Sequence, residues 1–170
     1  ISGKLKLFYE NKNETFAPIV SDDQGQYKLQ FVTKNNEDGS KTIYKVKNNL
    51  LVEPFLNIPE EDAWYSTRIF GLGETSNIVY VLNSISRNTT ALMKYDRKNN
   101  TTKLIYHDPK TDVSNVLFQP RKRNAQVVYN TFLKRKDHIL DDNIREDLNF
   151  LKRANKEREL YVISRALNDE

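Results

Sequence analysis

The sequence contains no cysteine, and its 170 residues include only two histidines, His107 and His138. The absence of cysteine excludes disulfide bonds and thiolate metal sites. No apolar stretch approaches the roughly 20 residues that a membrane-spanning helix needs. A strong excess of one charge is also missing, because 27 Lys and Arg residues stand against 23 Asp and Glu residues. The formal net charge of +4 indicates a soluble globular chain rather than a nucleic-acid-binding one.

What the sequence does contain is a regular succession of short strands. Residues 78–82, 91–95 and 103–106 are rich in β-branched and aromatic side chains and are separated by polar turns. Similar segments at residues 27–32 and 125–130 lie about 50 residues to either side, a spacing typical of propeller blades. One blade cannot bury both of its faces, so it must stack on neighbours.

We therefore predict a mainly β fold, with about three blades of an incomplete β-propeller built from antiparallel four-stranded meanders. The whole chain, residues 1–170, is then one partial propeller domain. Its predicted parts are the end of a blade (1–24), one blade (25–62), a second blade (63–111), and a blade with a helical insertion and the start of the next (112–170). Strands are expected at residues 4–9, 16–20 and 160–164, and Pro54 should place its strand at a sheet edge, because proline lacks a ladder donor.

One segment departs from the strand pattern. From Asn143 to about Lys156, the spacing predicts one inserted α-helix. Three apolar residues fall on one face of this helix: Ile144, Leu148 and Leu151. Asn143 and Glu146 have the spacing of a capping box at its start. We expect this helix to pack onto the outside of its own blade.

Several dispersed motifs resemble a known family. They are the runs at residues 87–92 (RNTTAL), 107–113 (HDPKTDV) and 116–120 (VLFQP), with Asp96 between the first two. In this order they resemble the amino-terminal β-propeller of bacterial acylaminoacyl-peptidase-like enzymes of the prolyl oligopeptidase family. The resemblance covers residues 69–169 well and 25–56 loosely. The sequence departs from the pattern at Asn88, where Asp is common, and at His138, where tryptophan is common.

The resemblance implies a role as well as a fold. Members of that family carry an α/β-hydrolase domain with a Ser-Asp-His triad, whose serine lies in a Gly-x-Ser-x-Gly elbow. This chain has five glycines and no such elbow. We therefore predict a non-catalytic, substrate-gating propeller of a bacterial serine peptidase, whose partners are the hydrolase domain of the same protein and, transiently, peptides. The alternative is a free-standing propeller-like interaction module without peptidase activity.

Two further expectations concern the chain as a whole. Since its first residue is Ile1 and not methionine, we expect it to be a piece of a longer protein, cytoplasmic or else periplasmic. Blades that lack neighbours would expose apolar side chains, so self-association is expected. The residues concerned are Leu5, Leu7, Val162 and Ile163.

The individual residues that could carry chemistry have simpler structural interpretations. His107 ends a strand at an Asp-Pro turn, where it is expected to be a solvated turn residue. His138 lies near Asp137, Asp141 and Asp142, which could bind a cation, although aspartates are also expected before a helix. We therefore predict no catalytic, cofactor-binding or metal-binding residue.

The remaining motifs also favour structural roles. Gly71 and Gly73 are expected in a tight turn, because no following helix completes a phosphate site. Trp64 and Tyr65 are expected to pack between blades or under a loop. The basic runs 121–123 and 134–136 flank a strand, so they should lie at its opposite ends and form no common groove for nucleic acid.

Overall fold

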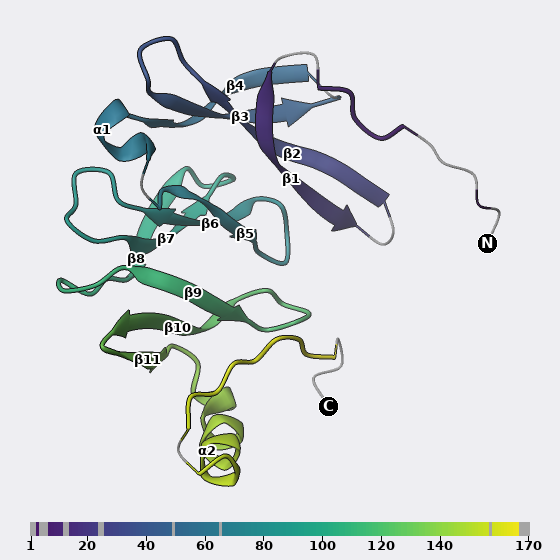
Figure 1. Ribbon diagram of the computed structural model, residues 1–170. Coiled ribbons are helices and arrows are strands. Elements are labelled where there is room, and N and C mark those ends of the chain that lie inside the picture. Colours follow the sequence, from purple (N-terminus) through teal and green to yellow (C-terminus); the bar gives the residue numbers. More distant parts are fainter. Residues whose placement is uncertain are drawn as a thin grey trace. The chain divides into compact units, whose positions relative to one another are not determined.

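The computed structural model describes residues 3, 7–11, 14–23, 26–48, 50–64, 66–156 and 158–166. The described chain is mainly β and forms three antiparallel sheets of three or four strands (Figure 1). This confirms the predicted fold class, a set of propeller-like blades. The chain divides into two compact units, Ile1–Thr67 and Arg68–Glu170. None of the helices in the described part is long and apolar enough to cross a membrane.

The first unit is a four-stranded sheet followed by one helical turn. The strands are β1 (Thr15–Asp23), β2 (Gln26–Asn35), β3 (Lys41–Lys47) and β4 (Leu50–Ile58), in the order β1-β2-β3-β4, and the turn is α1 (Glu60–Ala63). Each strand pairs with the next along the chain, as in a meander. Pro54 lies in the edge strand β4, as its missing N–H predicts.

The boundary predicted between residues 24 and 25 is corrected by the pairing of β1 with β2. The backbone of Ser21 lies opposite that of Lys28, so the hairpin continues through the segment that was expected to separate two blades. The polar side chains of this segment predict a turn, but the backbone pairing of β1 with β2 continues almost to the tip of the hairpin. Of the strand expected at residues 4–9, residues 7–9 have no strand structure and residues 4–6 lie outside the described residues.

The second unit contains two sheets. The first comprises β5 (Arg68–Leu72), β6 (Ile78–Asn83), β7 (Ala91–Asp96) and β8 (Thr101–Tyr106), in the order β5-β6-β7-β8. The second comprises β9 (Val113–Phe118), β10 (Ala125–Phe132) and β11 (Lys134–Ile139), in the order β11-β10-β9. The strand expected at residues 160–164 is absent, since this described segment has no regular structure. The last sheet therefore has three strands.

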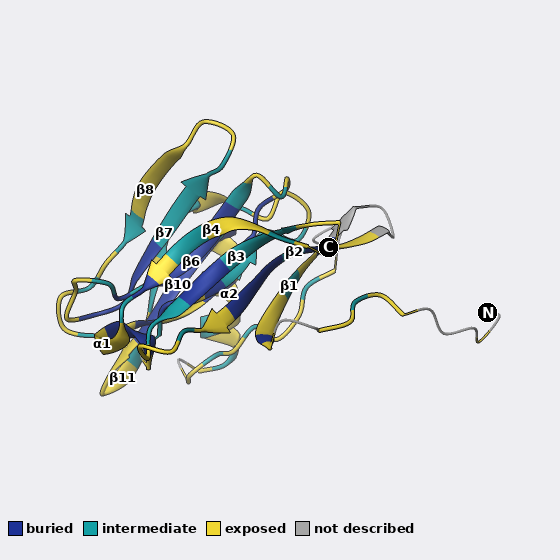
Figure 2. Cartoon of the chain, turned by 90° about the horizontal axis from the view of Figure 1, so that it is seen from above, coloured by how far each residue is buried: buried dark blue, intermediate teal, exposed yellow. Residues whose placement is uncertain are grey.

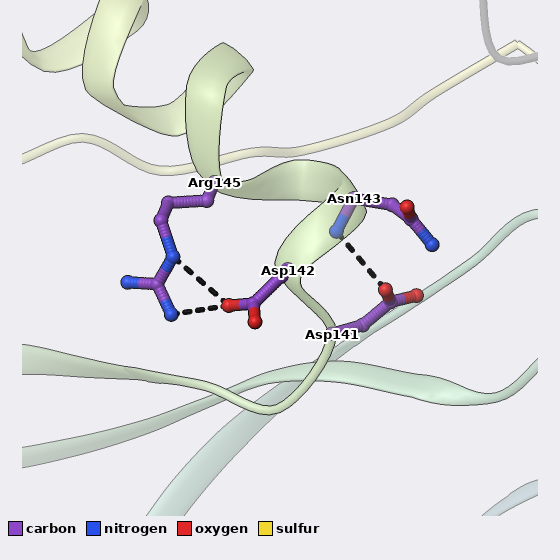
Figure 3. Close-up of polar contacts among 4 residues, drawn as sticks. All are labelled: Asp141, Asp142, Asn143 and Arg145. Atoms are coloured by element: carbon purple, nitrogen blue, oxygen red, sulfur yellow. Dashed lines mark hydrogen bonds and ion pairs between the residues drawn. The ribbon is translucent and has the colours of Figure 1, made fainter.

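The predicted helix is present, but it begins differently. A 3₁₀ turn, η1 (Asp142–Ile144), leads into α2 (Arg145–Ala154). The cap of the turn is Asp141, whose carboxylate accepts the N–H of Asn143 at 3.1 Å (Figure 3). Asn143 therefore does not head a capping box. An aspartate two positions before the expected cap satisfies the same free backbone donor.

The β9–β11 sheet is covered on both faces. One face packs against the β5–β8 sheet through a buried apolar cluster: Tyr80, Leu82, Leu92, Val113, Val116 and Val128. On the other face, Ile144 and Leu148 of the helical segment pack on Val127 and Tyr129. Leu151, the third apolar helix residue, is 39% exposed. The helix thus covers its own sheet as predicted, on the face that a following blade would occupy, while the edge strand β8 stays largely exposed (Figure 2).

Candidate functional site

A cleft of about 590 Å³ lies between the two sheets of the second unit, beside the β5–β6 and β9–β10 turns. Its volume is within the usual range of small-molecule sites, about 300 to 1,000 Å³. The side chains that give it chemical character are mostly charged or amide groups: Glu74, Lys94, Lys122, Arg123, Asn124 and Asp141. Tyr80 and Ile78 contribute an apolar wall.

The β9–β10 turn holds the basic residues of the cleft. The N–H of Arg123 donates to the carbonyl of Gln119 at 2.9 Å, and the N–H of Gln119 donates to the carbonyl of Asn124 at 3.0 Å. The side-chain oxygen of Gln119 also accepts the N–H of Arg121 at 2.8 Å and that of Lys122. Arg123 has a φ of 51°, in the left-handed region that favours glycine and asparagine. One glutamine therefore organises the whole turn.

Asp141 connects the turn to the helix. Its carboxylate accepts hydrogen bonds from Gln126 at 3.0 Å, from the N–H of Asn143 at 3.1 Å and from Asn124 at 3.4 Å. The Gln126 amide, followed by the Asn143 N–H, holds the pKa of Asp141 below its ordinary value. Gln126 is buried and in turn accepts from Arg165 at 2.6 Å.

Two kinds of group in the cleft lack a close bonding partner among the described residues. The side-chain oxygen Oδ1 of Asn124 is buried and has no hydrogen-bond partner among the described residues. Lys94, Lys122 and Arg123 form no ion pair with a carboxylate in the part of the chain that the structure describes. The cleft is thus lined by three cationic and two acidic side chains, and Oδ1 of Asn124 is enclosed beside it.

His107 has a partner that the sequence did not indicate. Its Nε2 lies 3.0 Å from the hydroxyl oxygen of Thr89, and that hydroxyl also lies 2.5 Å from the carbonyl oxygen of Asp108. A carbonyl can only accept, so the single hydroxyl proton goes to Asp108 and His107 must donate from Nε2. The distance between Thr89 and His107 is that of a nucleophile and its base, but the direction of their hydrogen bond is not. His107 is an exposed turn residue, as predicted, with this additional bond.

The motif residues behind the family resemblance join successive strands. Asp112 accepts the N–H of the buried Thr90 at 2.6 Å. Asp108 accepts the N–H of Lys110 at 2.8 Å and the side-chain amide of Asn130 at 2.9 Å. The Lys110 N–H is the main reason that the pKa of Asp108 is lowered. The β8–β9 loop is therefore bonded to the start of β7 and to β10, and Asn130 is the member that sequence reasoning missed.

The aspartates around His138 do not converge. Asp137 pairs with Lys152 at 2.8 Å, and Asp142 pairs with Arg145 at 2.9 Å (Figure 3). The ring of His138 instead lies 4.5 Å from that of Tyr106. Among the described residues, no group of three His, Cys, Asp or Glu side chains could hold a metal ion.

Of the two glycines expected in a tight turn, only Gly73 borders one; Gly71 lies within a strand, where close packing and not turning requires a glycine. Gly71 lies within β5, where an added Cβ would come 3.3 Å from the Phe118 ring of the neighbouring sheet. Gly73 begins the turn and donates to the carbonyl of Ile78 at 2.8 Å. A Cβ at Gly73 would lie 2.6 Å from that of Ile78, so a larger residue cannot fit without rearrangement.

Trp64 does not pack as expected. Its side chain is 84% exposed, and the Lys41 ammonium lies 5.0 Å from the ring centroid. Because Lys41 also donates to the Ala63 carbonyl at 2.5 Å, this contact holds the end of α1 against β3. Tyr65 lies outside the described residues.

The two basic runs lie at opposite ends of β10. Residues 121–123 belong to the β9–β10 turn, whereas Lys134 pairs with Phe132 at the far end of the strand. Arg135 is enclosed by aromatic rings, with its guanidinium 3.8 Å from the Tyr129 centroid and 4.1 Å from that of Tyr161. It fixes the C-terminal segment to the sheet and is not part of a free basic surface.

Comparison with protein-family models, with curated proteins and with solved structures gave no match.

Proposed function

We propose that the chain is the non-catalytic, substrate-gating propeller part of a bacterial prolyl oligopeptidase-family serine peptidase. The observation that supports this proposal is the set of bonds made by the β8–β9 loop. Asp108 and Asp112 lie in the Asp-Pro-x-x-Asp motif on which the family resemblance depends, and their carboxylates bond to Asn130 and to the Thr90 N–H. A motif that joins neighbouring strands between blades has a physical reason to recur in propellers.

The chemistry of the described residues agrees with a non-catalytic role. The closest approach to a hydrolytic pair is Thr89 with His107, and there the hydroxyl proton is already given to a carbonyl. An enzyme that accelerates hydrolysis by the usual factor of about 10⁶ or more needs an activated nucleophile and an oxyanion site. Under this proposal both come from an α/β-hydrolase domain of the same protein, and the propeller limits access to peptides.

The test is to recover the coding sequence that follows Glu170 in the source genome and to express both proteins. A fluorophosphonate probe should label the longer product at the serine of a Gly-x-Ser-x-Gly elbow and leave the 170-residue chain unlabelled. A longer product without such an elbow would overturn the proposal. Labelling of the short chain at Ser84, Ser114 or Ser164 would contradict its non-catalytic role.

A free-standing interaction module is the second candidate. It is favoured by the position of η1 and α2, which cover the outer face of the third sheet through Ile144 and Leu148, respectively. Stacked repeat proteins use such a terminal cap to keep their last unit soluble. If the coding sequence ends at or shortly after Glu170, this second function replaces the first.

A further inference from the structure

We propose that residues 158–166 form a strap that opens and closes over the third sheet without unfolding it, and that Arg135 is the latch of this strap. In the closed state, which the structure shows, the strap returns from α2 along the sheet (Figure 1). When it opens, it uncovers part of the face on which a following blade would stack. The inference uses only contacts within the second unit and holds whichever of the two proposed functions is correct.

Arg135 joins the strap to the sheet in three ways. Its guanidinium is stacked between a ring of the sheet, Tyr129, and a ring of the strap, Tyr161, with 3.8 Å and 4.1 Å to the two centroids. Its Nη1 donates to the carbonyl of Leu160 at 2.8 Å, and its backbone N–H donates to the carboxylate of Glu159 at 3.4 Å. A planar guanidinium stacks with its faces while its edge donates hydrogen bonds, which a lysine ammonium cannot do.

Beyond this latch, the strap has few attachments to the sheet. At its far end, Arg165 donates to the side-chain oxygen of Gln126 at 2.6 Å. Among the described residues, no backbone hydrogen bond joins residues 160–164 to a strand. The side chains of Tyr161 and Ile163 are 59% and 90% exposed. Segments with few buried apolar contacts and no backbone ladder open at a far lower free energy than the whole fold.

The sheet keeps its apolar cover when the strap leaves. The described cluster on this face comes from β9, β10, β11 and the helical segment and includes no residue of the strap: Leu117, Val127, Tyr129, Ile139, Ile144 and Leu148. A cleft of about 220 Å³ lies where the start of the strap meets the sheet and α2. The strap is therefore not closely packed on the core, and its opening creates no buried cavity.

The experiment is limited proteolysis of the full chain with chymotrypsin, with mass spectrometry to follow cleavage of the bond after Tyr161. The protease must take the Tyr161 ring into its own pocket, so the bond is cut only after this ring has left Arg135. Slow cleavage of the unaltered chain is expected. Its rate should change little with urea below the unfolding transition, because a local opening exposes little new surface.

The variant Arg135→Lys should be cut about tenfold faster or more, because lysine keeps the charge but loses the stacking and the forked donor. Its urea midpoint should change little, since the apolar cluster keeps all its members. Arg145→Lys is the matched control, because it makes the same substitution at an arginine that bonds to Asp142 and not to the strap. This control should be cut at the rate of the unaltered chain.

Any of three results would overturn the proposal. The first is that Arg135→Lys is cut no faster than the unaltered chain, and the second is that Arg145→Lys is accelerated equally. The third is a cleavage rate of the unaltered chain that rises steeply with urea, which would show that the strap leaves only when the whole unit unfolds. This last measurement needs no variant, so it decides the question even if Arg135→Lys does not fold.

Discussion

Replacing Leu148 with alanine tests whether α2 is part of the core of the second unit. Leu148 is 4% exposed and packs with Ile144 on Val127 and Tyr129. The substitution removes three carbon atoms, which at about 0.8 kcal/mol each gives about 2.4 kcal/mol. The cavity adds to this cost, and the helix propensity of alanine offsets a few tenths of a kcal/mol. We therefore expect unfolding to become easier by about 2.5 kcal/mol.

The measurement is urea unfolding followed by far-ultraviolet circular dichroism. Tryptophan fluorescence is unsuitable, because the only tryptophan, Trp64, belongs to the first unit. The control is Leu151→Ala, one turn further along the helix, where 39% exposure predicts a loss of about 1 kcal/mol or less. A loss below about 0.5 kcal/mol in Leu148→Ala, or equal losses in both variants, would show that the helix is a solvated arm.

Three further predictions concern hydrogen bonds, pH and assembly. Asp112→Ala should destabilise by about 1 to 3 kcal/mol, because the buried Thr90 N–H loses its acceptor; Asp112→Asn, which keeps an oxygen there, should recover most of this in the same urea titration. Hydrogen bonds hold the pKa of Asp141 below its ordinary value of 3.8 in the folded protein, so the folded state binds fewer protons than the unfolded chain as the pH falls through this range. The stability that Asp141 contributes should therefore be complete above about pH 5 and should be lost progressively as the pH falls below about 4 and through the lowered pKa of the folded state. Asp141→Asn should flatten this acid limb of the thermal midpoint, and an unchanged limb would refute the assignment. Because Leu7 and Ile163 are exposed, sedimentation across a hundredfold concentration range should show self-association, and a monomer throughout would show that these side chains are tolerated in water.

The sequence predicted the local elements well because their signals are local. The strands expected at residues 78–82, 91–95 and 103–106 coincide closely with β6, β7 and β8. Each combines β-branched or aromatic residues with an adjacent polar turn, so neighbouring residues are enough to define it.

Features that depend on residues far apart in the sequence could not be predicted from it. The extension of β1 through Ser21 depends on its partner β2, and residues 160–164 are kept out of the sheets by contacts such as that of Arg135 with Tyr161. A strand-like composition cannot reveal either. Tertiary context decides both.

The candidate cleft could not be predicted for the same reason. It forms because turns near Glu74 and Arg123, about 50 residues apart, meet at one end of two stacked sheets. Basic residues in a turn are usually solvated, and nothing in the sequence marks Asn124 as a buried acceptor. The charge of the run at residues 121–123 is visible in the sequence, but only the stacked sheets show that Arg123 lines the cleft and Arg121 does not.

The cover that α2 places over the third sheet also affects the order of folding during synthesis. Val127 and Tyr129 are buried by residues that follow them by fewer than 25 positions, namely Ile144 and Leu148. The ribosome therefore needs to release only a short further stretch before this apolar face is protected. Intermediates that expose such faces are the ones that aggregate. We expect the second unit to become resistant to proteases on ribosome-bound chains as soon as α2 has left the exit tunnel.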